Sequence, residues 1–124
     1  MILDAGILIG FDRGDDLAAK AVAALDRYGG SLRTSAPVVA QVWRAGRTQA
    51  RLARLLQIVE VHPFVDGRRV GSMLAAAGTS DVVDAHLVLL AAQLGDAVLA
   101  GDPDDLQPLA DTLGRAAPRV YAWP

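Results

Sequence analysis

Four aspartates in three separate segments of the sequence are candidates for one chemical site. Asp4 directly follows a short apolar run, Asp102 follows another, and Asp81 and Asp84 open a predicted helix. Because residues three apart on a helix share a face, the side chains of Asp81 and Asp84 are expected to lie together. Each acid also has an ordinary explanation as a helix cap or as a partner of the helix dipole. That explanation is weakest for Asp84, because the dipole effect fades within one turn.

Carboxylates gathered at one place would require a cation to offset their mutual repulsion. The sequence has no cysteine and only two histidines, His62 and His86, which excludes a thiolate or histidine-rich metal site. Oxygen ligands alone select a hard ion, and the four aspartates therefore indicate Mg²⁺ or Mn²⁺. Such ions bridge phosphate oxygens and lower the pKa of a bound water molecule. The natural substrate of such a site is a phosphodiester.

A basic segment between residues 37 and 59, with four arginines and no acid, suggests a polyanionic substrate. Ser35 is a plausible N-cap for a helix that is predicted to run to about Gln57. On a helical wheel, one face of that helix carries Trp43, Arg44, Arg47, Arg51 and Arg54. Arginine binds phosphate and stacks on bases, as tryptophan does. The alternative is an ordinary solvated helix face, and the formal net charge of −2 gives no overall attraction for nucleic acid.

The remaining segments alternate between strand and helix patterns. Short apolar runs predict strands over residues 1–3, 32–34, 58–61, 97–100 and 119–122. Helices are predicted over residues 6–11, 15–28, 66–77, 81–94 and 104–113. Thr79 and Ser80 are expected to cap the helix over 81–94. This alternation indicates a parallel sheet covered on both faces, in which ligands bind beyond the carboxyl ends of the strands. Asp4 and Asp102 both occupy such positions.

Length and composition favour one domain over residues 1–124. The chain is 52% hydrophobic and 21% charged, which excludes a disordered protein. Its longest stretch without a polar side chain is residues 5–11, far below the ~20 residues of a membrane span. No secretory signal is visible, so we expect a cytoplasmic protein that does not bind membranes. A phosphoacceptor receiver domain would need a lysine near the last strand, yet the only lysine is Lys20. No glycine-rich dinucleotide-binding motif follows the first strand.

Two segments resemble a known family. The opening MILDAG is similar to the start of a PIN domain, and TSDVVDAHLVLLAAQLGDAVLAGDPDDL is similar to its acid-bearing helix, fourth strand and final acid. Layout and length are similar to the VapC-like toxins of bacterial type II toxin–antitoxin pairs. The resemblance implies a three-layer α/β/α sandwich with a five-stranded parallel sheet in the order 3-2-1-4-5. It also implies an endoribonuclease that depends on Mg²⁺ or Mn²⁺, forms a homodimer and is inhibited by a cognate antitoxin.

The resemblance assigns roles to five residues. Asp4, Asp84 and Asp102 match three of the family's acids and are the predicted catalytic residues. Together with Asp81, which matches an additional acid of many relatives, they are the predicted metal ligands. The family's second acid falls at Gln41, whose amide offers the ion only a neutral oxygen at the rim of the site.

Two further departures leave a second hypothesis open. Gly6 and Ala100 stand where family members commonly carry Ser or Thr hydroxyls near the metal. With Gln41, they allow a PIN-like RNA-binding or antitoxin-binding module whose cleavage activity is weakened or lost.

Overall fold

Five short strands form one parallel sheet in the computed structural model, which describes residues 1–123. The strands are β1 (Ile2–Leu3), β2 (Arg33–Ser35), β3 (Glu60–His62), β4 (Val98–Ala100) and β5 (Val120–Ala122). Their order is β3-β2-β1-β4-β5, and every neighbouring pair is parallel. The predicted strand order is therefore confirmed.

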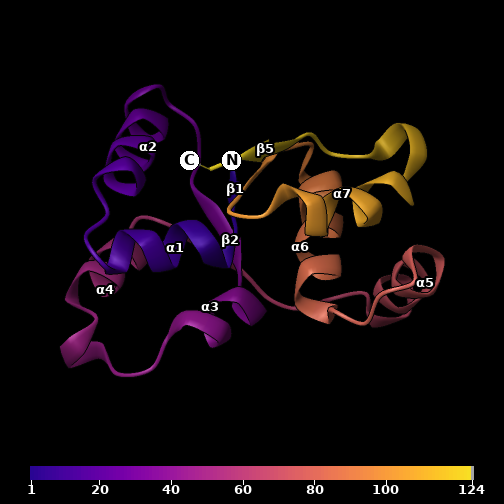
Figure 1. Ribbon diagram of the computed structural model, residues 1–124, viewed down its shortest axis with the longest axis horizontal. Coiled ribbons are helices and arrows are strands. Elements are labelled where there is room, and N and C mark those ends of the chain that lie inside the picture. The colour runs from indigo at the N-terminus through magenta and orange to yellow at the C-terminus, as the bar shows by residue number, and fades with distance from the viewer. Residues whose placement is uncertain (124) are drawn as a thin grey trace.

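Helices cover both faces of the sheet, as predicted for a three-layer sandwich (Figure 1). On one side lie α1 (Ala5–Asp12), α2 (Asp16–Arg27), α3 (Ala36–Val42) and α4 (Ala50–Leu56). On the other side lie α5 (Gly67–Ala77), α6 (Val82–Leu94) and α7 (Pro103–Asp111). Two short 3₁₀ turns, η1 (Gly46–Thr48) and η2 (Gly114–Ala116), complete the described elements.

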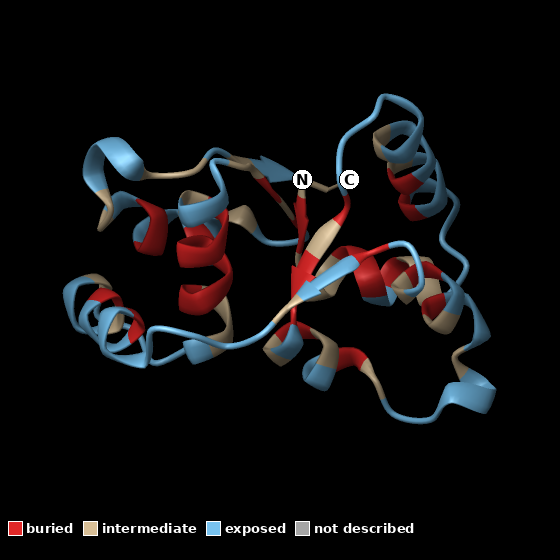
Figure 2. Cartoon of the chain, turned by 180° about the vertical axis from the view of Figure 1, so that it is seen from behind, coloured by how far each residue is buried: buried red, intermediate tan, exposed pale blue. Residues whose placement is uncertain are grey.

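The core is formed by the central strands and by α6. Ile2 and Leu3 of β1 are fully buried, and residues 85–91 of α6 are all buried, as the red segments of Figure 2 show. A helix that is apolar on all sides is expected in the interior of a protein. Within residues 1–123, no single helix is long and apolar enough to cross a membrane. The helices α5 and α6 reach that length and hydropathy only when they are taken together, and the chain bends by 110° between them.

The predicted continuous helix up to Gln57 is wrong. The helix α3 ends at Val42, the backbone of Trp43 and Ala45 is extended, and a new helix begins at Ala50. The chain breaks here because Gln49 supplies hydrogen bonds that a continued helix would otherwise provide. Its Oε1 atom accepts from the backbone N–H groups of Arg44 and Ala45, at 2.6 and 3.0 Å. The arginines therefore do not form one helical stripe.

The predicted caps are confirmed at one helix and wrong at another. Ser35 caps α3 by accepting a hydrogen bond of 3.2 Å from the Val38 N–H. The helix α6 is capped by Asp81 rather than by Thr79 or Ser80, because Asp81 Oδ1 accepts from the Asp84 N–H at 3.0 Å. An aspartate fills this position as well as a hydroxyl side chain does. The start of α6 therefore lies one residue later than predicted.

Candidate active site

Asp4 lies where β1 ends and α1 begins, and both of its carboxylate oxygens are held by the backbone. Oδ1 accepts a hydrogen bond of 3.1 Å from the Ile7 N–H, and Oδ2 accepts one of 2.9 Å from the Gly101 N–H. Burial raises the pKa of Asp4 above its usual range and outweighs these hydrogen bonds, which lower it; the charge of Asp102 raises it further. Asp4 is thus both the cap of α1 and a fixed acid at the carboxyl edge of the sheet.

A close approach between two glycines explains the orientation of Asp4. A Cβ atom on Gly6 would lie 3.1 Å from the Cα atom of Gly101 and 3.2 Å from Asp4 Oδ1. Both distances are tighter than ordinary van der Waals contact. Gly6 therefore permits the start of α1 to touch the end of β4, where the Gly101 N–H reaches the Asp4 carboxylate. In this chain a side chain at position 6 would disturb that contact.

Asp84 is the most strongly perturbed acid of the site. Its pKa is raised to about 7, first because the carboxyl is partly buried, then because of the charge and hydrogen bond of Asp81, and then because of the charges of Asp105 and Asp4. Three acids thus raise the pKa of the Asp84 carboxyl: one follows the carboxyl end of β1, one caps α6, and one lies in the first turn of α7. Such convergence of like charge is typical of functional sites.

Asp102 and Asp105 extend this cluster from the start of α7. Asp102 occupies the N-cap position ahead of Pro103, but its exposed side chain makes no capping hydrogen bond. The purely capping interpretation of this acid is therefore not supported. Asp105 was not among the predicted site residues. Its spacing from Asp102 equals that between Asp81 and Asp84, and this repeated pattern could have identified it from the sequence.

We use the term acid cluster for these five residues: Asp4, Asp81, Asp84, Asp102 and Asp105. Their oxygen donors and unbalanced charge match the preferences of a hard divalent ion. Within residues 1–123, however, no group of three or more His, Asp or Glu side chains is arranged to hold an ion directly. Mg²⁺ usually retains several water molecules and needs only one or two direct carboxylate ligands. The cluster fits such a hydrated ion better than a closed protein cage.

Gln41, the predicted rim ligand, lines a different hollow. It lies at the end of α3, beside a pocket of about 190 Å³ between α1, α3 and α4. That pocket is also lined by Asp12, Arg13, Arg44 and Gln49, and by no member of the acid cluster. The role of Gln41 as a metal ligand remains a prediction.

The predicted RNA-binding residues are divided between two elements. Arg44 and Arg47 belong to the connection between α3 and α4, whereas Arg51 and Arg54 lie on α4. Trp43 is partly buried and packs against the hydrophobic core, so much of its ring is already in contact with protein. A contribution of these residues to RNA binding remains a prediction, although it no longer rests on a continuous helix.

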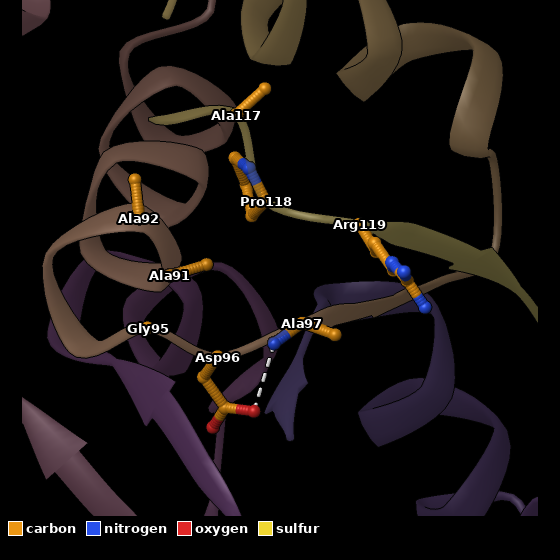
Figure 3. Close-up of a pocket in the computed structure, with 8 residues that line it drawn as sticks. All are labelled: Ala91, Ala92, Gly95, Asp96, Ala97, Ala117, Pro118 and Arg119. Atoms are coloured by element: carbon orange, nitrogen blue, oxygen red, sulfur yellow. Dashed lines mark hydrogen bonds between the residues drawn. The ribbon is translucent and has the colours of Figure 1, made fainter. Parts of the chain in front are cut away.

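A second cavity lies at the opposite edge of the sheet. It has a volume of about 320 Å³ and is lined by residues that precede β4 and β5, among them Asp96 and Arg119 (Figure 3). Asp96 accepts hydrogen bonds from the Ala97 N–H at 2.8 Å and from the Met1 amine at 2.6 Å. Although burial alone would raise the pKa of Asp96, these bonds lower it. Asp96 thus anchors the N-terminus and lies apart from the acid cluster.

The comparisons with known proteins agree with this fold. A family model described as PIN domain matches residues 1–111. No curated protein sequence matches the chain significantly. Among solved structures, the chain is similar to a chain of VapBC2 from Rickettsia felis, with a TM-score of 0.74 and 13% sequence identity. In that crystal structure VapBC2 is bound to a DNA fragment from its promoter. The match covers 99% of this chain and 98% of that one. With most of its length matched by the family model, the chain belongs to the PIN domain family.

Proposed function

We propose that this protein is a metal-dependent endoribonuclease that serves as the toxin of a toxin–antitoxin pair. The observation that carries the proposal is the acid cluster, in which burial and then three neighbouring carboxylates raise the pKa of Asp84 to about 7. Membership in the PIN family supports it, because PIN domains are generally nucleases. In this proposal Asp4, Asp84 and Asp102 hold a hydrated Mg²⁺ or Mn²⁺, partly through its bound water molecules, with Asp81 beside them. The ion, when bound, supplies positive charge to phosphate oxygens and lowers the pKa of a water molecule.

The three catalytic acids have different parts in this proposal. Asp4 is oriented by the N–H groups of Ile7 and Gly101, so it requires little reorganisation to face the ion. The raised pKa of Asp84 favours its protonated form, so the ion competes with a proton for this carboxylate. The exposed Asp102 side chain has no capping bond to break. Binding of the ion would relieve the repulsion that raises the pKa of Asp84.

An RNA substrate is proposed because the chain offers arginines for phosphate groups despite its negative net charge. Arg44, Arg47, Arg51 and Arg54 are all exposed, and the segment that contains them has no acid. Guanidinium groups bind phosphate oxygens in a fork and stack on unpaired bases. These side chains would hold the RNA strand while the acid cluster acts on one phosphodiester.

The proposed partners are a cognate antitoxin and a second copy of the chain. The solved structure from Rickettsia felis is described as VapBC2, and this likeness in fold supports an antitoxin partner here. An antitoxin that placed a basic side chain among the acids would offset the same repulsion as the metal. The molar mass of the purified protein in solution tests the homodimer, which should have twice the 13.0 kDa of one chain.

The proposal is tested by incubating the purified protein with RNA in the presence of Mn²⁺ or Mg²⁺. We expect cleavage that a chelator stops and that Asp84→Asn abolishes. Asp26→Asn, which removes an exposed acid from α2, is the matched control and should cleave like the wild type. Cleavage retained by Asp84→Asn would contradict the assignment of the site.

The competing function is an RNA-binding or antitoxin-binding module that no longer cleaves. It is favoured by Gln41, which stands in place of the family's second acid. Gln41→Glu separates the two functions. A large gain of cleavage would indicate that the natural site is weakened, whereas unchanged cleavage would indicate that the amide suits the native chemistry.

A further inference from the structure

Gln49 uses the full hydrogen-bonding capacity of its side-chain amide. Its Oε1 atom accepts from the backbone N–H groups of Arg44 and Ala45, at 2.6 and 3.0 Å. Its Nε2 atom donates to the Val42 carbonyl at 2.8 Å and to Asp12 Oδ2 at 3.2 Å. An amide has two donors and two acceptor lone pairs, and all four are used here. Only the side-chain amide of glutamine or asparagine can make all four of these hydrogen bonds. Of the two, only the glutamine side chain is long enough to reach these partners.

Asp12 connects this arrangement to α1. Its Oδ2 atom accepts from Gln49, and its Oδ1 atom accepts from the Leu52 N–H at 3.3 Å, near the start of α4. The Asp12 side chain therefore ties the end of α1 to the residue that shapes the connection between α3 and α4. These contacts join segments that lie 37 and 40 residues apart in the sequence.

The connection itself, residues 43–48, is called here the Arg44 loop. The Trp43 ring packs so closely on Gly46 that a Cβ atom there would lie 3.0 Å from it. Arg44 Nη1 donates to the carbonyls of Trp43 and Ala40, at 2.7 and 3.2 Å, which fixes the guanidinium beside the end of α3. These bonds use two of the five donors of the guanidinium. Arg44 lines the same 190 Å³ pocket as Arg13.

We propose that Gln49, held by Asp12, is a positioning residue that fixes the Arg44 loop so that Arg44 and Arg13 bind a phosphate group of the RNA strand at this pocket. The inference rests on the proposed function and names a positioning residue and a phosphate contact for it. Without the amide, the N–H groups of Arg44 and Ala45 lose their acceptor. The loop then opens, and Arg44 loses its place beside the pocket.

Limited trypsin digestion measures the position of the loop without any RNA, because trypsin cleaves after Arg44 and Arg47. In Gln49→Glu, an oxygen replaces the donor that faces Asp12 and Val42, so two hydrogen bonds become repulsive contacts. We expect cleavage after Arg44 and Arg47 to accelerate about tenfold or more, since each lost bond costs on the order of a factor of ten. Cleavage after Arg115, in the distant η2 turn, is the internal control and should not change.

A rescue variant separates a specific contact from general damage. Adding Asp12→Asn to Gln49→Glu supplies an amide donor for the new carboxylate and keeps an oxygen for the Leu52 N–H. Each single variant should loosen the loop, and the double variant should be more protected than Gln49→Glu alone. Equal digestion of Gln49→Glu and the wild type, or no recovery in the double variant, would overturn the positioning role.

Binding of a single-stranded RNA without metal, followed by fluorescence anisotropy, tests whether the loop serves the substrate. Arg44→Ala and Gln49→Glu should each weaken binding about tenfold, which is the loss expected for a charge-assisted contact. Gln57→Glu adds the same negative charge at the exposed end of α4 and should weaken binding much less.

The outcomes distinguish this inference from the proposed function. Faster digestion of Gln49→Glu with unchanged RNA binding would show that Gln49 only stabilises the fold, and would overturn the inference while leaving the nuclease intact. A wild-type protein that binds no RNA would contradict the proposed function, and the inference would fall with it. Three results together would establish the inference. Gln49→Glu should be cleaved faster in the Arg44 loop, it should bind RNA more weakly, and the double variant should regain protection from trypsin.

Discussion

The backbone N–H of Gly101 donates a hydrogen bond of 2.9 Å to Asp4 Oδ2, which joins the ends of β1 and β4 across 97 residues of sequence. With the bond from the Ile7 N–H to Oδ1, it holds both oxygens of the carboxylate in place. The orientation of Asp4 is therefore a property of the sheet edge, and it depends on how closely α1 approaches β4.

The first prediction concerns Gly6, which permits that approach. In Gly6→Ala the added methyl group would lie 3.1 Å from the Gly101 Cα atom. We expect the free energy of unfolding to fall by about 1–3 kcal/mol, as for other overpacked sites. Displacement of Gly101 should also weaken Mn²⁺ binding, because Asp4 then loses its orienting bond. Urea unfolding and calorimetric titration measure the two effects.

The control is Gly71→Ala, in the middle of α5, where an added Cβ atom meets nothing within 4 Å. Alanine is the better helix former, so this variant should gain about 0.5–1 kcal/mol. Equal stability changes in the two variants would contradict the role of the glycine contact.

The second prediction follows from the pKa of Asp84, which is raised to about 7 from its usual value of 3.8. Because the folded state binds this proton more tightly than the unfolded state, the associated stability is fully present below about pH 4 and is lost as the pH rises towards 7. Asp84→Asn removes the ionisable group. In the presence of a chelator, the variant should be more stable than the wild type at about pH 8, and the difference should disappear near pH 4.

Thermal unfolding of both proteins across this pH range provides the measurement. A constant difference in melting temperature at every pH would show that the pKa of Asp84 is not raised in the folded protein. Added Mn²⁺ should stabilise the wild type more at about pH 8 than at about pH 5, because protons and the ion compete for the same carboxylate.

The third prediction compares two neighbouring acids in the first turn of α7. The charge of Asp105 is one of the main causes that raise the pKa of Asp84, whereas the charge of the adjacent Asp104 is not. Asp105→Asn should therefore lower the pKa of Asp84, and Asp104→Asn should change it less. An NMR titration of the Asp84 carboxyl carbon measures both shifts. Equal shifts of the Asp84 pKa in the two variants would show that the overall negative charge of α7, and not Asp105 in particular, raises it.

Much of the acid cluster could be predicted because it depends on local patterns and on one property of parallel sheets. Asp4 and Asp102 follow short apolar runs, and the carboxyl ends of neighbouring parallel strands meet at one edge. Asp81 and Asp84 share a helix face through their spacing alone. Asp105 carries the same spacing signal relative to Asp102, so the sequence also contains the pattern that identifies it.

The Arg44 loop could not be predicted in this way. A helical wheel considers neighbours three and four residues apart, and by that criterion residues 38–56 form a helix with an apolar side. The break instead depends on Gln49 and on its contact with Asp12, which lies 37 residues earlier in the chain. Likewise, the sequence marks Gly6 only as a position that lacks a hydroxyl group. Its close approach to Gly101 is visible only once β1 and β4 are paired.

The most direct test of the account is calorimetric titration of the metal-free protein with Mn²⁺ at about pH 8, where Asp84 is largely ionised. We predict that the wild type and Asp26→Asn bind Mn²⁺ and that Asp84→Asn does not. Absence of binding to the wild type, both alone and with RNA present, or binding that Asp84→Asn retains, would contradict a metal site at the acid cluster.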